Sequence, residues 1–168
     1  MKLIEFLEEN RSRITEKWLR AVIDTYPVES GKFLFDNQNQ FSNPLGYTIS
    51  ENLPEIFNEL LESKEPERLY KPLEAIIKIR AVQEYSPSEA VGFLYLLKQI
   101  IRDEFYHLDN PNKPFRSLLE FESKIDQAVS MAFDIYSGLK EKIYEIKANE
   151  VRDRFGKMVD RLNTKYGD

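Results

Sequence analysis

The one histidine of the chain, His107, follows Glu104 in a Glu-x-x-His spacing that places both side chains on the same face of a helix. Helical bundles bind two metal ions through two such motifs and further glutamates, because the ions need several carboxylates and a pair of imidazoles. The chain contains no second histidine and no cysteine. We therefore predict that no metal is bound and that His107 ends a helix, where the helix dipole favours a positive charge.

No arrangement of residues that is typical of catalysis can be recognised in the sequence. His107 precedes a predicted loop, and no serine lies in a nucleophile elbow that a histidine could serve. The six glycines form no phosphate-binding loop. We expect a protein that is not an enzyme and that carries no cofactor.

Arg80 is the charged residue whose position most needs an explanation. It follows Ile76 and Ile77 by four and three residues, on or beside the apolar stripe of its helix. One interpretation is structural: the guanidinium pairs with a carboxylate, for which Asp134 is a candidate, or it extends to solvent.

The other interpretation of Arg80 is an anion-binding residue in an internal pocket. Gln83 follows it by three residues, and Tyr47 or Tyr95 could complete the lining of such a pocket. We favour the interpretation in which these residues close the space, and the pocket remains the alternative.

Charge and hydropathy exclude several classes of partner. The net charge of -5 gives no attraction to nucleic acid. The longest apolar run, at 90–97, is far shorter than the roughly 20 residues that span a bilayer, and the first residues do not resemble a signal peptide. Because the lack of cysteine also suits a reducing compartment, we expect a cytoplasmic protein that neither binds nucleic acid nor inserts into a membrane.

Prolines and capping residues divide the chain into helices, so the predicted fold class is all-α. Ser86-Pro87-Ser88-Glu89 is a capping box with proline at the first helical position and gives the clearest helix start. The predicted helices cover about 3–9, 10–24, 44–60, 66–84 and 87–106, with a short one at 33–38, a loop at 109–114 and a last helix to the chain end.

The last predicted helix carries two apolar seams with the spacing of a heptad repeat. The first seam, which should close the core of a domain at 1–147, consists of Ile125, Val129, Ala132, Tyr136, Leu139, Ile143 and Ile146. The second seam faces another direction and consists of Tyr144, Ala148, Val151, Phe155, Met158 and Leu162.

We expect the second seam to lie on a helical extension at 148–168 that projects from the core. Val151, Phe155, Met158 and Leu162 are its candidate contacts for a second copy or a partner protein, and Glu150 is spaced to pair with Arg154 four residues later, as is Asp153 with Lys157. Folding back onto the core, or fraying in solution, are the alternatives.

Four segments of the chain resemble one known family. The segments EENRSRITEKWLRAV, FSNPLGYTISENL, IIKIRAVQEYSPSEAVGFLYLLK and AFDIYSGLKEKIYEIKANEV are similar, in this order, to the N-terminal sensor domain of RsbR-type stress regulators, the RsbRD N-terminal family. The similarity extends from about Leu3 to Arg152. It implies a globin-like fold without haem, and the stretch at 76–84 that would supply a proximal haem ligand indeed holds no histidine.

The resemblance also implies a function. Members of the family are followed by a STAS output domain, whereas this sequence stops soon after the last predicted helix, so we expect a stand-alone input module. The resemblance further implies a dimer that forms partly through the helix that leads to the output domain in other members. The combined prediction is a globin-like all-α bundle with a long C-terminal helix. We expect a non-enzymatic sensory or regulatory homodimer that contacts a partner such as a STAS protein or a kinase, and we leave open whether a small ligand binds in an internal pocket. The alternative is a protein-interaction adaptor with a filled core and no ligand.

Overall fold

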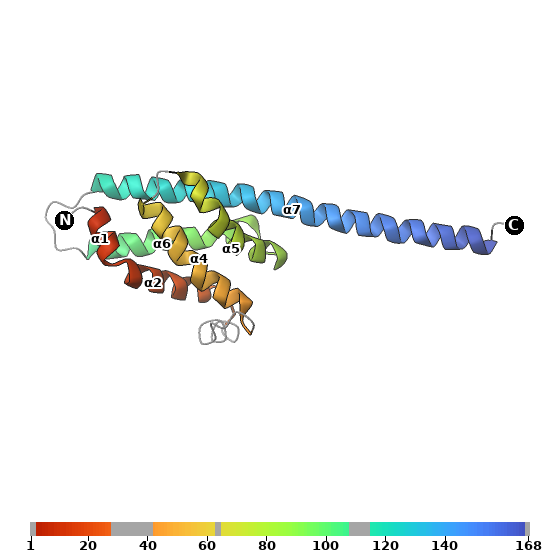
Figure 1. The fold of residues 1–168 in the computed structure, drawn as a ribbon, viewed down its shortest axis with the longest axis horizontal. Coiled ribbons are helices and arrows are strands. Elements are labelled where there is room, and N and C mark those ends of the chain that lie inside the picture. The colour runs from red at the N-terminus through yellow and green to blue at the C-terminus, as the bar shows by residue number, and fades with distance from the viewer. Residues whose placement is uncertain (1–2, 28–41, 63–64, 108–114, 167–168) are drawn as a thin grey trace.

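A computed structural model of the chain describes residues 3–27, 42–62, 65–107 and 115–166, and within these ranges it contains helices and no strand (Figure 1). The elements are α1 (Leu3–Glu9), α2 (Arg11–Ile23), α4 (Pro44–Glu62), the 3-10 turn η1 (Pro66–Leu69), α5 (Tyr70–Val82), α6 (Pro87–Tyr106) and α7 (Phe115–Tyr166). The predicted short helix at 33–38 and the predicted loop at 109–114 lie outside the described residues. The prediction of an all-α bundle with a long C-terminal helix extending from it is confirmed.

The helices pack into one bundle from which α7 continues alone. The first half of α7 contacts α5, α6 and α4, while α2 lies on the other side against α6 and α4. Figure 1 shows the second half of α7 running out of the bundle to the C-terminus without a neighbour among the described elements. With 52 residues, α7 is about 78 Å long at 1.5 Å per residue.

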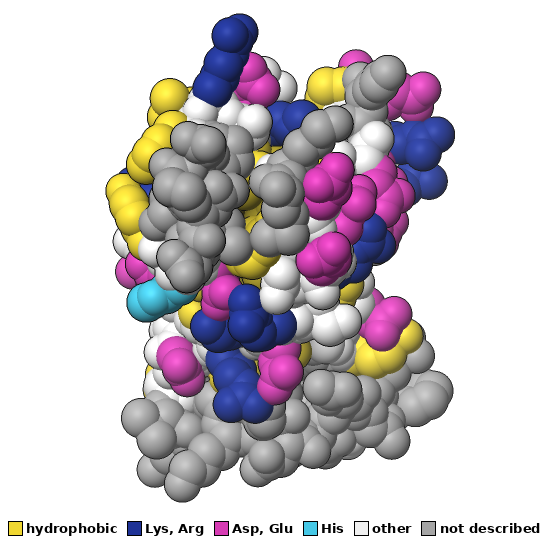
Figure 2. All heavy atoms as spheres, turned by 90° about the vertical axis from the view of Figure 1, so that its left-hand side faces the viewer, with side chains coloured by type: hydrophobic (Ala, Val, Ile, Leu, Met, Phe, Trp, Pro, Cys, Tyr) yellow, Lys and Arg dark blue, Asp and Glu magenta, His cyan; other side chains and the backbone are white. Residues whose placement is uncertain are grey.

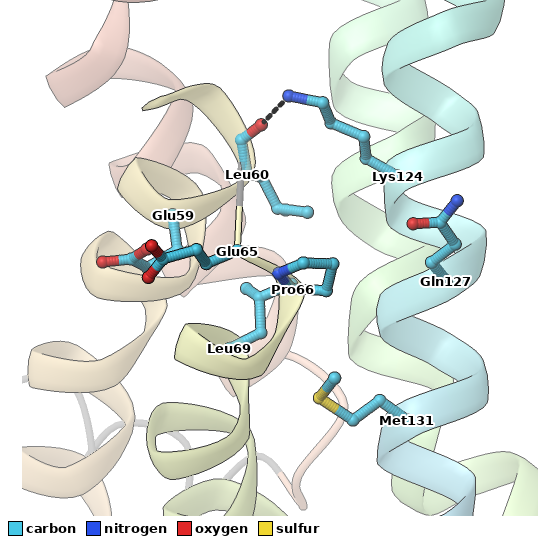
Figure 3. A pocket seen from close by; sticks show the side chains of 8 residues that line it. All are labelled: Glu59, Leu60, Glu65, Pro66, Leu69, Lys124, Gln127 and Met131. Atoms are coloured by element: carbon cyan, nitrogen blue, oxygen red, sulfur yellow. Dashed lines mark hydrogen bonds between the residues drawn. The ribbon is translucent and has the colours of Figure 1, made fainter. Parts of the chain in front are cut away.

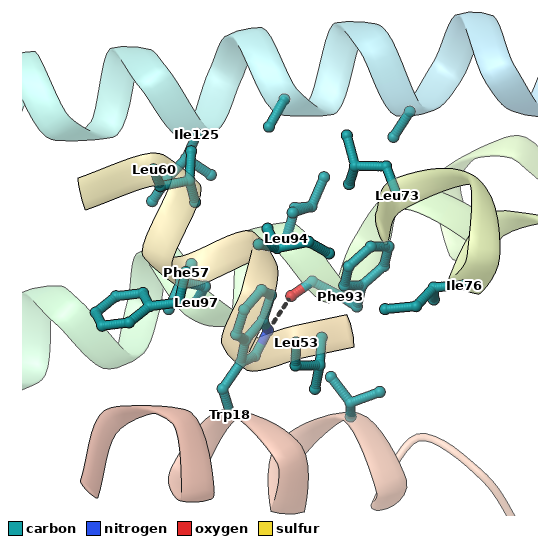
Figure 4. Packing of buried hydrophobic residues seen from close by; sticks show 14 of the residues in the cluster. Trp18, Leu53, Phe57, Leu60, Leu73, Ile76, Phe93, Leu94, Leu97 and Ile125 are labelled. Atoms are coloured by element: carbon teal, nitrogen blue, oxygen red, sulfur yellow. Dashed lines mark hydrogen bonds between the residues drawn. The ribbon is translucent and has the colours of Figure 1, made fainter. Parts of the chain in front are cut away.

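Trp18 is among the largest fully buried side chains of the core. Its ring is fully buried, stacks on Phe93 with 6.0 Å between ring centroids, and donates its indole N–H to the Phe93 carbonyl at 2.6 Å (Figure 4). Around this pair pack apolar residues from α4, α5, α6 and α7, including Leu53, Phe57, Leu60, Leu73, Ile76, Leu94, Leu97 and Ile125. Leu53, Phe57 and Leu60, which are spaced by four and three residues on α4, therefore share the face that packs into the core.

Side-chain caps fix two of the helix starts, and one of them is the capping box that the sequence predicts. The Asn43 side chain accepts a hydrogen bond from the first turn of α4 at 2.9 Å. Ser86 and Glu89 form the reciprocal capping box of α6, and these hydrogen bonds lower the pKa of Glu89. Asn10 differs: it precedes α2 but its amide donates to the Phe6 carbonyl at 2.8 Å, so it satisfies the end of α1 instead.

The first seam of α7 is buried only over the length of helix against which the bundle packs. Ile125, Ala132 and Tyr136 are buried, and Ile143 is partly buried. Ile146, predicted as the end of this seam, is 59% exposed. The core therefore ends near Ile143, because no described element reaches further along α7.

Candidate functional site

The two residues of the Glu-x-x-His motif lie in different environments. Glu104 is buried and accepts from Arg13 and Lys17 of α2, each at 2.5 Å. His107 is exposed and is the C-cap residue of α6, as predicted, and Figure 2 shows the histidine at the surface among acidic and basic side chains of mixed sign. Among the described residues, no three His, Cys, Asp or Glu side chains form a group that could hold a metal ion. The glutamate thus joins two helices.

Arg80 is a buried cation that joins the end of α5 to the start of α6. Only 2% of the residue is exposed, and its Nη1 donates to the backbone carbonyl of Glu89 at 2.8 Å. Asp134, the carboxylate proposed as its partner, is exposed on α7. Within the described part of the chain Arg80 forms no ion pair, so its charge is balanced by no carboxylate there.

Three aromatic rings surround the Arg80 guanidinium. Its central carbon lies 5.2 Å from the ring centroids of Tyr85 and Phe93 and 5.8 Å from that of Tyr26. Aromatic faces attract a cation, and the attraction is greater where water is excluded. We call Arg80, Tyr26, Tyr85 and Phe93 the Arg80 cluster.

One edge of the guanidinium lacks a hydrogen bond of good geometry. Among described residues, Arg80 Nε and Nη2 are buried without a well-placed acceptor, and the Tyr26 hydroxyl is near enough to Arg80 and Tyr85 to interact weakly with both but forms no well-aligned hydrogen bond. Nε and Nη2 lie on one edge of the planar group, where their N–H bonds point in parallel and match the two oxygens of a carboxylate. The cluster therefore offers an unused bidentate anion-binding edge.

Tyr26 is protonated in this environment. Burial raises its pKa to about 12, although the nearby positive charge of Arg80 acts in the opposite direction. At neutral pH the hydroxyl is therefore a neutral donor rather than a counter-charge for Arg80.

The four residues proposed for an internal pocket differ in burial. Arg80 is buried, whereas Gln83 is exposed as the C-cap of α5 and Tyr95 is 46% exposed on α6. Tyr47 is half-buried on α4. Of the four, only Arg80 belongs to the Arg80 cluster.

The sequence pattern did not indicate the aromatic residues that contact Arg80. Tyr26 follows the end of α2, and Tyr85 directly precedes the capping box of α6. Both stand at helix boundaries, where periodicity assigns no inward face. Their positions beside the end of α2 and the start of α6 could be located from the sequence. Only the folded chain, however, brings the two rings together at Arg80.

The Arg80 cluster is tied to α7 through the backbone of the α5–α6 loop. The Tyr136 hydroxyl donates to the Tyr85 carbonyl, and Lys140 Nζ donates to the Ala81 carbonyl at 3.3 Å. Tyr136 and Lys140 are four residues apart and so lie one turn from each other on α7. The last buried turn of α7 thus holds the loop that carries Tyr85.

The conformation of this loop depends on Glu84. Glu84 has φ of 62°, in the left-handed region, and the Tyr85 N–H donates to the Arg80 carbonyl at 3.2 Å. This is the pattern of a Schellman helix end, in which the second residue after the C-cap packs back on the helix. Here that contact is the Tyr85 ring against the Arg80 guanidinium. An exposed salt bridge of 3.6 Å from Glu84 to Lys147 adds a further link to α7.

The structure also has a groove between α4, η1 and α7, with a volume of about 390 Å³ (Figure 3). Lys124 crosses it to donate to the Leu60 carbonyl at 3.0 Å, which satisfies the end of α4. Its lining residues are Glu59, Leu60, Glu65, Pro66, Leu69, Lys124, Gln127 and Met131. Two similar grooves lie between α2 and α4 and between α5 and α7, and none of the three is lined by the Arg80 cluster.

The second half of α7 is exposed on all sides. Every side chain from Tyr144 to Tyr166 is exposed, and the candidate contacts Val151, Phe155, Met158 and Leu162 are 50% to 67% exposed. This helix projects from the core, as predicted, and does not fold back onto the described part of it. That a second copy or partner covers it stays a prediction.

In the described ranges, no helix is both long enough and apolar enough to cross a membrane. The fold and the site define a small all-helical domain with a buried cationic cluster and a single long helix leading away from it. Residues 12–151 match the family of the RsbT co-antagonist protein rsbRD N-terminal domain, and the chain belongs to this family. The comparison with curated proteins and the comparison with solved structures gave no match.

Proposed function

We propose that this chain is a non-enzymatic sensory or regulatory domain in which α7 reports the state of the Arg80 cluster to a partner protein. The family is of the stressosome sensor type and is named for a co-antagonist of RsbT, which favours regulation through protein contacts. We extend the proposal to a cytoplasmic homodimer that contacts a STAS protein or a kinase.

The observation that carries the proposal is the double role of Tyr85. Its ring lies against the Arg80 guanidinium, while its carbonyl is held by Tyr136 of α7. A change at Arg80 that moves Tyr85 also changes the packing of α7 at the turn where it leaves the core. Such a link lets a ligand shift the populations of two arrangements of the long helix.

The ligand class that suits the cluster is a small carboxylate. The Nε and Nη2 edge of Arg80 provides two parallel donors, and the Tyr26 hydroxyl provides a third. Because the edge is buried, a ligand that reaches it displaces side chains that now cover it. Binding and movement of the cluster are therefore coupled.

A thermal-unfolding experiment tests the ligand class. Sodium acetate and sodium succinate are compared with sodium chloride at equal ionic strength, for the wild type and for Arg80→Lys, which keeps the charge but loses the planar fork. We expect a carboxylate to raise the midpoint in the wild type only, and hydrogen exchange at 136–147 to change with it. Equal effects of all three salts would contradict the proposal.

The second candidate is an adaptor with a filled core. It is favoured by the exposure of the second seam, which leaves an apolar surface for a partner protein. Native mass spectrometry of the freshly purified protein separates the two functions. A stoichiometric small molecule supports the sensor, and its absence together with partner binding that ignores Arg80→Lys supports the adaptor.

A further inference from the structure

The exposed seam of α7 is bordered by basic side chains. Ala148, Phe155 and Leu162 occupy the a positions of its heptads, and Tyr144, Val151 and Met158 the d positions. Cations stand at the flanking e and g positions: Arg152 on one edge, and Lys147, Arg154 and Arg161 on the other. Glu145 is the one carboxylate at these flanking positions between Tyr144 and Leu162.

The other acidic side chains of this segment point away from the seam. Glu150 occupies a c position, and Asp153 and Asp160 occupy f positions, on the outer face. Apart from Glu145, the carboxylates therefore lie on the outer face, where Lys157 also lies, while the arginines lie beside the apolar seam. A helix that is merely solvated does not need such a division.

The flanking cations are also unpaired within the helix. The pairs expected from four-residue spacing, Glu150 with Arg154 and Asp153 with Lys157, are not formed among the described residues. In the same part of the chain Arg152 and Arg161 form no salt bridge. Three guanidinium groups beside the seam are thus available to carboxylates of another molecule.

A second copy of the same helix supplies the wrong charges. In a parallel pair, g faces the following e position of the partner helix, which sets Lys147 against Arg152. In an antiparallel pair centred on the seam, Arg154 faces its own symmetry mate. Like charges at these positions oppose pairing, and in neither direction does Arg152, Arg154 or Arg161 face a carboxylate. The favourable pair of the parallel arrangement, Lys140 with Glu145, lies where α7 leaves the bundle.

We propose that the exposed seam of α7 binds an amphipathic helix of another protein whose own apolar seam is bordered by glutamate or aspartate. The apolar residues supply the buried area, and the flanking arginines select the acidic partner through charge complementarity. The family match ends at Val151, so Phe155, Met158 and Leu162 lie beyond the part of the chain that the family describes. This inference does not depend on a ligand at Arg80.

Two synthetic helical peptides of roughly four heptads test the proposal. They share one seam of leucine and isoleucine, and one carries glutamate at every e and g position while the other carries lysine. Calorimetric titration of the full chain should show that the glutamate peptide binds at least about tenfold more tightly. Arg154→Glu should lower its affinity several-fold, whereas Lys157→Glu, the same charge reversal at an outer position three residues later, should change it less than about twofold.

Two results would overturn the proposal. Equal affinity for both peptides would show that the flanking charges select nothing. Sedimentation equilibrium that finds a dimer which dissociates when residues 149–168 are deleted would show that a second copy occupies the seam.

Discussion

The hydroxyl of Tyr136, on the last buried turn of α7, donates a hydrogen bond to the backbone carbonyl of Tyr85 in the α5–α6 loop. These residues are 51 positions apart in the sequence, and their contact joins the helix that leaves the bundle to the loop that covers Arg80. A rigid link at this point makes the position of α7 sensitive to the Arg80 cluster.

Replacing Tyr136 by phenylalanine should therefore destabilise the domain while leaving its ring packing intact. The Tyr85 carbonyl loses its donor, which costs about 1–2 kcal/mol for a largely buried group. Urea unfolding followed by Trp18 fluorescence measures the change. Tyr144→Phe removes a hydroxyl from a 61% exposed residue two turns later and should change stability by less than about 0.5 kcal/mol. Equal effects of the two variants would show that the Tyr85 contact is not special.

The sequence predicted the helices well because capping and periodicity are local. Ser86 and Glu89 form the capping box that the pattern indicates, and the seam change in α7 coincides with the end of the core. The Arg80 cluster was predicted only through Arg80 itself. Tyr26 and Tyr85 reach it through helix ends and a left-handed residue, and such geometry depends on tertiary contacts that a periodic pattern does not contain.

The left-handed Glu84 predicts a stabilising substitution. A non-glycine residue in this region costs roughly 1–2 kcal/mol, whereas glycine occupies it without a Cβ penalty. Glu84→Gly should raise the free energy of unfolding by about 1 kcal/mol, because the exposed salt bridge to Lys147 contributes little. Glu84→Ala loses the same salt bridge and keeps the strain, so it is the control and should be no more stable than the wild type.

The unpartnered edge of Arg80 predicts an unusual response to substitution. Arg80→Met keeps most of the side-chain volume and removes a buried charge, so its stability should lie within about 1 kcal/mol of the wild type. Arg80→Ala leaves a cavity and should cost about 3 kcal/mol. Chemical denaturation compares them. If Met is as costly as Ala, the guanidinium gains more from the ring contacts and the Glu89 carbonyl than its burial costs.

Glu122 should make the α6–α7 contact sensitive to acid. Hydrogen bonds from Arg102, at 2.5 and 2.8 Å, hold the pKa of Glu122 below its ordinary value of 4.5, although burial opposes the shift. A carboxylate whose pKa is lowered by folding stabilises the protein fully above pH 4.5, and this contribution is lost as the pH falls through the lowered pKa. The stability difference between wild type and Glu122→Gln should therefore shrink below pH 4.5. Glu120→Gln, two residues earlier at an exposed pair with Arg116, is the control.

The projecting half of α7 should unfold before the bundle. Its side chains from Tyr144 onward gain nothing from tertiary packing, which supplies most helix stability in proteins. Far-ultraviolet circular dichroism, which reports all helices, should begin to fall at a lower temperature than the fluorescence of the fully buried Trp18, which reports the core. Deletion of residues 149–168 should make the two transitions coincide without lowering the Trp18 midpoint.

The same two unfolding signals should also report the binding of the acidic peptide to the projecting half of α7. The acidic peptide should raise the early transition towards the late one, because a ligand that binds only the helical state stabilises it, and the stabilisation grows with the logarithm of the free peptide concentration. Arg154→Glu should reduce this effect and Lys157→Glu should not. A single transition in the partner-free wild type would contradict the prediction, since it would mean that the exposed half of α7 is already held by a contact as strong as those of the core.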